Sequence, residues 1–303
     1  MNEILARGES VVPDENLSIP HEKCPLCLST GAMNTELVLQ EAPEVLMLEC
    51  QNCKGVTANR YPDNEFLESL YDSSHYTSDM MASTRPVDRC AKKIISKIDL
   101  SGRDSVRIVD YGGSKGYLSS SVIDLITRKY PAITIEAYVV DFECQLEDPR
   151  INFLSIDDFF EKENNFDVII LSAVLEHLPE YRKTMKKVIN SWNKDGFLYI
   201  RTPYEAPLAK LLQSYKIRWP RHIHDMGSYF LENIFSTYEI NPRLIYSAPS
   251  VIEADYKLDS KRFILALVLK IPGIIESAVL KSAFGYKGSI WKLVGGWEVV
   301  YKN

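Results

Sequence analysis

Short apolar runs alternate with segments of helical periodicity along most of the chain, and the clearest example surrounds Asp110. Residues 106–109, which are apolar except for Arg107, are typical of a buried strand, and Asp110 follows directly after them. Apolar residues then recur three to four positions apart between residues 118 and 126, which indicates an amphipathic helix. A strand that enters a helix through a glycine-rich turn creates a ligand-sized crevice at the carboxyl edge of a sheet.

The same alternation continues to the end of the chain and predicts an α/β fold. The expected strands are residues 106–109, 133–140, 151–155, 166–171, 197–201, 243–247 and 297–301. Helical spacing between them predicts helices over 84–99, 181–194 and 228–237. Strands that alternate with helices favour a doubly wound, mostly parallel seven-stranded sheet with helices on both faces.

A different pattern precedes this region. Cys24 and Cys27 form one C-x2-C pair, and Cys50 and Cys53 form a second. Apolar residues at 37–39 and 45–48 predict a β-hairpin between the pairs. Four thiolates at this spacing suit a tetrahedral Zn²⁺, and because all four would be ligands the site would be structural. Four free cysteines in a small core are the alternative.

Composition restricts the partners and the compartment. The 303 residues carry a formal net charge of −6 with a pI of about 5.5, which disfavours nucleic acid as a partner. The first residues contain no long apolar segment, so we expect a cytoplasmic protein with reduced cysteines. Residues 262–284 are unusually apolar but interrupted, and we expect helices that cover the sheet or form a subunit contact, with peripheral membrane attachment as the alternative.

The glycine-rich turn carries the first resemblance to a known family. The pattern Asp110, Gly112, Gly113, Ser114 and Gly116 resembles the cofactor loop of class I S-adenosylmethionine-dependent methyltransferases, which usually have glycine where Ser114 stands. A purely structural turn and a dinucleotide-binding loop are the alternatives, although the latter requires a different glycine spacing.

The resemblance implies a Rossmann-like methyltransferase fold whose last strand is antiparallel, and it assigns further cofactor contacts. Asp141, at the end of the second strand, would bind the ribose hydroxyls, unless it is a solvated strand-end carboxylate. Asp157 or Ser155 would lie near the adenine amino group, with Ile156 against the ring. The segment Ser172 to His177 resembles the signature of the fourth strand, and His177 is either a general base or a group that orients its loop.

A four-cysteine ribbon followed by a proline turn, a short helix and a tyrosine-rich segment is similar to a bacterial methyltransferase group that modifies sugars and surface polysaccharides. This implies that Tyr76, with His75 beside it, covers the cofactor; an aromatic residue packed between domains is the alternative. The resemblance divides the chain into a lead-in (1–20), a zinc ribbon (21–60), a helical cap or linker (61–100) and a methyltransferase domain (101–303).

The segment 216–226 resembles the W-x-x-x-x-H region of the same group. His222 or His224 could remove a proton from an anionic or hydroxyl-rich acceptor there, unless the segment is a surface loop. The residue types also allow a metal site formed by His177, His222 and His224.

The expected reaction is methyl transfer from S-adenosylmethionine to oxygen or carbon of a small polar acceptor, with carbohydrate favoured. An RNA methyltransferase and a non-catalytic cofactor-binding scaffold are the rivals.

Overall fold

Two β-sheets organise the protein, and the larger one matches the sequence prediction. The computed structural model describes residues 8–73, 84–144, 146–212, 215–250 and 260–303. The larger sheet has seven strands in the order β10-β11-β8-β7-β4-β5-β6. Their bounds are β4 Ser105–Tyr111, β5 Thr134–Asp141, β6 Ile151–Ser155, β7 Phe166–Ser172, β8 Trp192–Tyr204, β10 Arg243–Pro249 and β11 Gly295–Lys302. The central pairs are parallel and β11 is antiparallel to both neighbours, so the predicted strands and the expected antiparallel last strand are confirmed.

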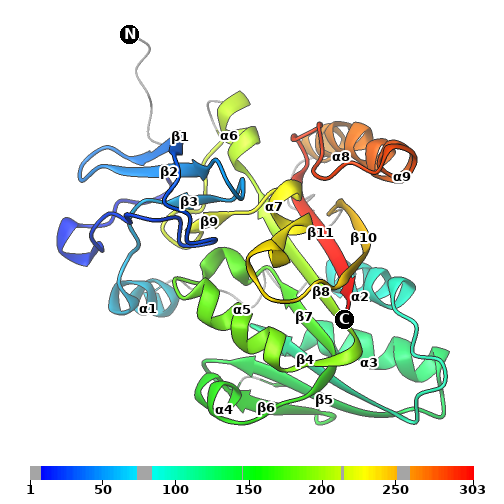
Figure 1. Cartoon of the computed structure of the whole chain (residues 1–303). Helices are drawn as coiled ribbons and strands as arrows, with labels where there is room; N and C mark the ends of the chain where they lie inside the picture. The colour runs from blue at the N-terminus through cyan, green and yellow to red at the C-terminus, as the bar shows by residue number, and fades with distance from the viewer. Residues whose placement is uncertain (1–7, 74–83, 145, 213–214, 251–259) are drawn as a thin grey trace.

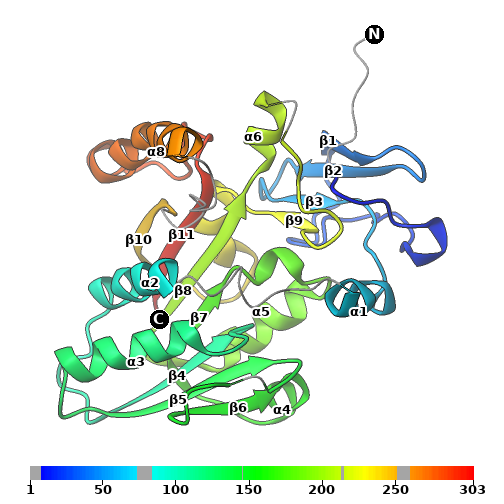
Figure 2. The same ribbon diagram turned by 180° about the vertical axis from the view of Figure 1, so that it is seen from behind.

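Helices cover both faces of this sheet (Figure 1, Figure 2). α2 (Thr84–Lys97) and α3 (Tyr117–Lys129) pack on one face, and α4 (Ile156–Glu161) and α5 (Tyr181–Asn190) on the other. The strands supply both cores because successive side chains alternate: Ile108 belongs to the α2–α3 core and Val109 to the α4–α5 core. Strands buried on both faces explain the continuous apolar runs in the sequence.

Two predicted helices are shorter than expected. The helix expected over 181–194 ends at Asn190, because β8 begins at Trp192. The helix expected over 228–237 is divided into α7 (Ser228–Glu232) and a 3₁₀ turn (Ile234–Thr237). Asn233 lies at the division, with its side chain donating to the carbonyl of Tyr229. Such local hydrogen bonds compete with helix continuation.

The N-terminal sheet has the strand order β1-β2-β3-β9. β1 (Met33–Gln40) and β2 (Val45–Cys50) form the predicted hairpin, followed by β3 (Val56–Ala58) and by α1 (Asn64–Ser73) outside the sheet. Its last strand, β9 (His224–Asp225), comes from the segment that follows β8 of the larger sheet. Trp219 is fully buried in the core of this sheet and donates to Gln40 Oε1 (2.9 Å). The residues expected as an independent ribbon therefore share their sheet and core with the segment 217–225.

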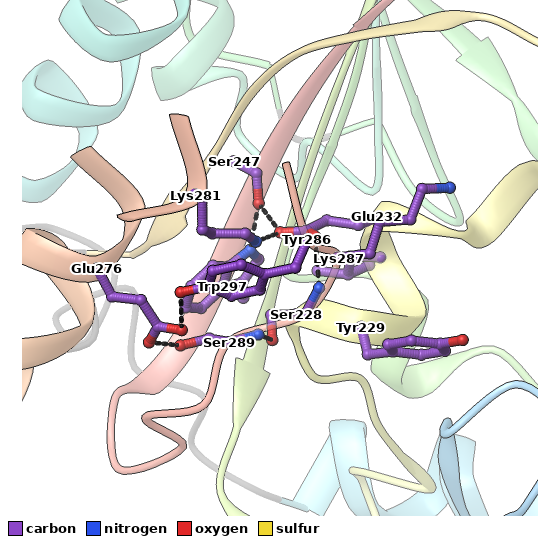
Figure 3. Close-up of polar contacts among 12 residues, drawn as sticks. Ser228, Tyr229, Glu232, Ser247, Glu276, Lys281, Tyr286, Lys287, Ser289 and Trp297 are labelled. Atoms are coloured by element: carbon purple, nitrogen blue, oxygen red, sulfur yellow. Dashed lines mark hydrogen bonds and ion pairs between the residues drawn. The ribbon is translucent and has the colours of Figure 1, made fainter. Parts of the chain in front are cut away.

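The apolar stretch near the C-terminus is one helical arm of α8 (Ser260–Ile275), a π-helical turn (Glu276–Leu280) and α9 (Lys281–Phe284). Figure 3 shows how two carboxylates anchor it: Glu232 accepts from Lys281 and the backbone N–H of Gly288, and Glu276 accepts from Ser289 and Tyr286. The outward side chains Ile264, Val268, Ile271, Ile275 and Val279 are exposed. Among the described residues, no helix is long and apolar enough to cross a membrane.

Candidate active site

The glycine-rich loop connects β4 to α3 at the carboxyl edge of the sheet and has the backbone conformation that the sequence predicts. Gly112 and Gly116 have φ of +74° and +77°, which favours residues without Cβ. A Cβ on Gly112 would lie 2.7 Å from Cγ2 of Val174, so this position requires glycine for space as well. Ser114 has φ of +49°, in the left-handed region, which gives a physical reason for the glycine that the family usually has there.

Asp141, the last residue of β5, links that strand to the loop that follows β4. Its Oδ2 accepts from the backbone N–H of Ser114 and its Oδ1 from that of Phe142, both at 2.8 Å. The first of these bonds joins the glycine-rich loop to the carboxylate predicted to bind ribose. The carboxylate is thereby fixed beside the loop, with the further lone pairs of its oxygens available to hydroxyl donors.

Asp110 lies beneath the loop and is fully buried. Its Oδ2 accepts from the hydroxyl of Ser119 in α3 (3.0 Å), and a Cβ on Gly113 would lie 2.9 Å from its Cγ. Burial, together with the nearby charge of Asp141, raises the pKa of Asp110 to about 7, although the hydrogen bond from Ser119 and the charge of Arg201 act in the opposite direction. The carboxyl group therefore supports the turn from within the fold.

The other residues predicted to contact the cofactor differ in their exposure and in their hydrogen-bond partners. Ser155 caps the N-terminus of α4, because its Oγ accepts from the backbone N–H of Asp158 (3.1 Å). Ile156 is half-buried against the core and Asp157 is exposed. Ser172 Oγ accepts from Arg201 Nε (3.1 Å). Tyr76 and His75 lie outside the described residues.

Two of the three predicted histidines form a cluster with two glutamates beyond the ends of β7 and β8. The rings of His177 and His222 are 4.8 Å apart between centroids, and His177 Nε2 is 3.8 Å from Glu176 Oε1. His177 Nδ1 donates to the backbone carbonyl of Arg221 (2.9 Å), since a carbonyl only accepts. Burial, with a contribution from His222, lowers the pKa of His177 to about 3, so this imidazole is neutral.

Glu205 forms a hydrogen bond with His222. Its Oε2 is 3.0 Å from His222 Nδ1, and its Oε1 accepts from the hydroxyl of Tyr215 (2.7 Å). Burial alone would raise the pKa of Glu205, but the bonds from His222 and Tyr215 hold it below its usual range. Glu205 is thus ionised and His222 donates to it. Burial also raises the pKa of Glu176 to about 7.

His224 differs from the other two histidines, because both of its ring nitrogens are engaged. Nε2 donates to the carbonyl of Leu178 (2.9 Å), so Nδ1 accepts from the hydroxyl of Thr57 (2.8 Å). The ring is fully buried, and burial lowers its pKa to about 4. These bonds join β3 of the N-terminal sheet to the turn before α5, which gives His224 a structural role.

Sequence reasoning missed Glu205, and it included Glu176 only as part of the segment Ser172 to His177, without a role in the site. Glu205 follows β8 directly, and Glu176 precedes His177 in the 3₁₀ turn Leu175–His177. Both positions follow strand ends, and that signal could have identified them. The sequence did not indicate that the segment carrying His222 returns to these strand ends.

The four cysteines form a second cluster, at the N-terminal sheet. Cys24 Sγ lies 3.8 Å from Cys53 Sγ, and Cys27 Sγ lies 3.7 Å from Cys50 Sγ. A tetrahedral zinc ion with Zn–S bonds of about 2.3 Å places its sulfurs roughly 3.8 Å apart, so the cluster fits this ion. The two knuckles are alike: the residue after each pair, Leu28 or Lys54, has positive φ and donates its N–H to the first cysteine carbonyl at 2.8 Å.

Comparisons with known proteins agree with this architecture. Residues 81–238, just over half of the chain, match the family described as "Methyltransferase domain". The chain therefore belongs to this family, and its sheet has the Rossmann-like fold of class I S-adenosylmethionine-dependent methyltransferases.

Two solved structures with low sequence identity are similar to this chain. A SAM dependent methyltransferase from Archaeoglobus fulgidus is 15% identical, with 80% of this chain and 100% of that chain covered and a TM-score of 0.41. The N-methyltransferase NodS from Bradyrhizobium japonicum WM9, in complex with S-adenosyl-l-homocysteine, is 11% identical, with 80% and 99% covered and a TM-score of 0.45. No curated protein matches the sequence.

Proposed function

We propose that this methyltransferase transfers the methyl group of S-adenosylmethionine to an oxygen or carbon of a small polar acceptor, with a sugar or nucleotide-sugar as the favoured class. One observation carries the proposal: the loop held by Asp141 and the cluster of Glu176, His177, Glu205 and His222 follow strands of the same sheet edge. In doubly wound sheets ligands bind outside the carboxyl ends of the strands.

The cofactor half of the site consists of residues 110–116 and the ends of the neighbouring strands. Asp141 would accept hydrogen bonds from the ribose hydroxyls, and the turn at Gly112 and Gly113 would leave room for the methionine portion. Ser155, Ile156 and Asp157 are proposed near the adenine; Ser155 would act there as the cap that fixes the first turn of α4. Tyr76 is proposed to cover the cofactor, and Ser172 to contact it.

The acceptor half consists of the histidine–glutamate cluster. In the reaction the bond from the sulfonium sulfur to the methyl carbon breaks, a bond from that carbon to the acceptor oxygen or carbon forms, and the acceptor loses one proton. His222, oriented by Glu205, and His177 are the candidate bases. In each ring the hydrogen bond at Nδ1 places the proton on that nitrogen, so Nε2 is the atom that would accept the proton of the acceptor. His224, the third histidine predicted as a base, has neither nitrogen available.

The four-cysteine cluster is proposed to bind one structural Zn²⁺. All four thiolates would be ligands, which leaves no open coordination position for catalysis. The ion would stabilise the sheet to which His224 and Asp225 contribute β9. Zinc would thereby support the acceptor side of the site only indirectly, through the segment that carries His222.

The proposal is tested by incubating the purified protein with methyl-labelled S-adenosylmethionine and a panel of free sugars and nucleotide-sugars, with RNA as a comparison. We expect labelled product from a carbohydrate acceptor, and loss of turnover with retained cofactor binding in His222→Ala. Labelling of RNA in a salt-dependent manner would replace the carbohydrate assignment. Cofactor binding without turnover on any acceptor class would favour the scaffold.

A further inference from the structure

We propose that Glu176, His177 and His222 bind one divalent first-row transition-metal cation, at a site separate from the four cysteines. One ligand atom from each of these residues lies within 4.8 Å of the other two. Two imidazole nitrogens and one carboxylate oxygen form a donor set that suits Zn²⁺, Co²⁺ and Fe²⁺, and it leaves coordination positions open for a further ligand.

The outer hydrogen bonds of the two histidines are those expected of metal ligands. His177 Nδ1 donates to the carbonyl of Arg221, and His222 Nδ1 donates to the carboxylate of Glu205. Each bond places the proton on Nδ1, so the lone pair of each ring is on Nε2. Metal-binding histidines are commonly oriented in this way by a carbonyl or carboxylate behind the ring.

The carboxylate gives the second, independent observation. Glu176 is 1% exposed, and its Oε2 has no hydrogen-bond partner among the described residues. A buried carboxylate oxygen without a partner is costly, whereas a bound cation satisfies it. The residue types alone allow a metal site formed by His177, His222 and His224. Both ring nitrogens of His224 are engaged in hydrogen bonds, so Glu176 is the third ligand instead.

The role of this cation rests on the proposed function, although its binding does not. An acceptor hydroxyl at an open coordination position would become more acidic and release its proton to water, so His177 and His222 would act as ligands rather than bases. The side chain of His177 is 25% exposed, so solvent reaches this member of the cluster.

The experiment titrates Co²⁺ into the full-length, zinc-loaded protein and follows heat and visible absorption. We expect one equivalent to bind with d–d absorption and without sulfur-to-metal charge transfer, because nitrogen and oxygen are the ligands. Glu176→Gln and His222→Ala should weaken binding more than tenfold. Glu205→Gln, which changes only the group behind His222, should weaken it by about 10- to 100-fold. Glu180→Gln is the matched control, since Glu180 is exposed and lies four residues from Glu176.

Three results would overturn the cation site: no uptake by the wild type, uptake with sulfur charge transfer alone, or equal affinity of the Glu176→Gln and Glu180→Gln variants. Titrating S-adenosylmethionine into the same preparations separates the two proposals and reports on folding. Co²⁺ binding without cofactor binding would refute the methyl-transfer proposal and leave the cation site in place.

Discussion

Removal of the Asp141 carboxylate tests the cofactor half of the site. In the structure its two oxygens already accept the backbone N–H groups of Ser114 and Phe142 at 2.8 Å, so the group is fixed before any ligand binds. Two ribose hydroxyls would add two hydrogen bonds to a charged acceptor, each of which contributes about 1.5–3 kcal/mol. Asp141→Ala also releases Ser114, which is held at φ of +49°.

We therefore expect Asp141→Ala to weaken S-adenosylmethionine binding by about 3–6 kcal/mol, a rise in Kd of roughly 150- to 25,000-fold. Asp141→Asn keeps one acceptor oxygen and should lose about 1.5–3 kcal/mol. Isothermal titration calorimetry measures both, with denaturant unfolding as a check on the fold. Asp195→Asn is the matched control. Asp195 lies near the amino end of β8, whereas Asp141 lies at the carboxyl end of β5.

An Asp141→Ala variant whose Kd stays within twofold of the wild type would refute the assignment of this carboxylate to the ribose. A loss of affinity in Asp195→Asn of the same size would show that the effect is not local to the loop.

Three further predictions concern stability and zinc. His224→Ala removes a fully buried ring, leaves the Leu178 carbonyl without its donor and takes one of two close partners from the Thr57 hydroxyl, so it should lower the free energy of unfolding by about 2–4 kcal/mol in urea titrations, whereas unchanged stability would contradict its structural role. Burial raises the pKa of Asp110 from 3.8 to about 7, so the folded state binds the extra proton and stability falls as pH rises through this interval. Asp110→Asn should remove up to about 4 kcal/mol of that decline between pH 4 and 8. Equal slopes of the unfolding free energy against pH in the wild type and the variant would refute this prediction. Cys27→Ser should lose the zinc equivalent held by the four cysteines in metal analysis, whereas Cys144→Ser, at an exposed cysteine outside the cluster, should keep it.

Much of the architecture could be predicted from the sequence because its signals are local. Near-continuous apolar runs such as 166–171 specify strands buried on both faces, and the glycine spacing at 112–116 specifies a turn that needs positive φ. The C-x2-C pairs specify two knuckles in the same way. Each of these signals depends on residues within a few positions of one another.

Contacts between distant segments could not be predicted in this way. The pairing of β3 with β9 joins residues 56–57 to 224–225, and no periodicity in either segment indicates it. That pairing buries His224 against Thr57 and brings His222 to Glu205 and His177. The clash that requires glycine at position 112 likewise comes from Val174, on another strand end.

The sequence by itself determined the order and type of the strands in the larger sheet, the cysteine knuckles and the glycine-rich loop, because short-range spacing encodes each of them. Only the tertiary structure decided which histidines share a site and which glutamates accompany them. The physical reason is that the burial and hydrogen-bond partners of His177, His222 and His224 depend on where the chain returns after β8.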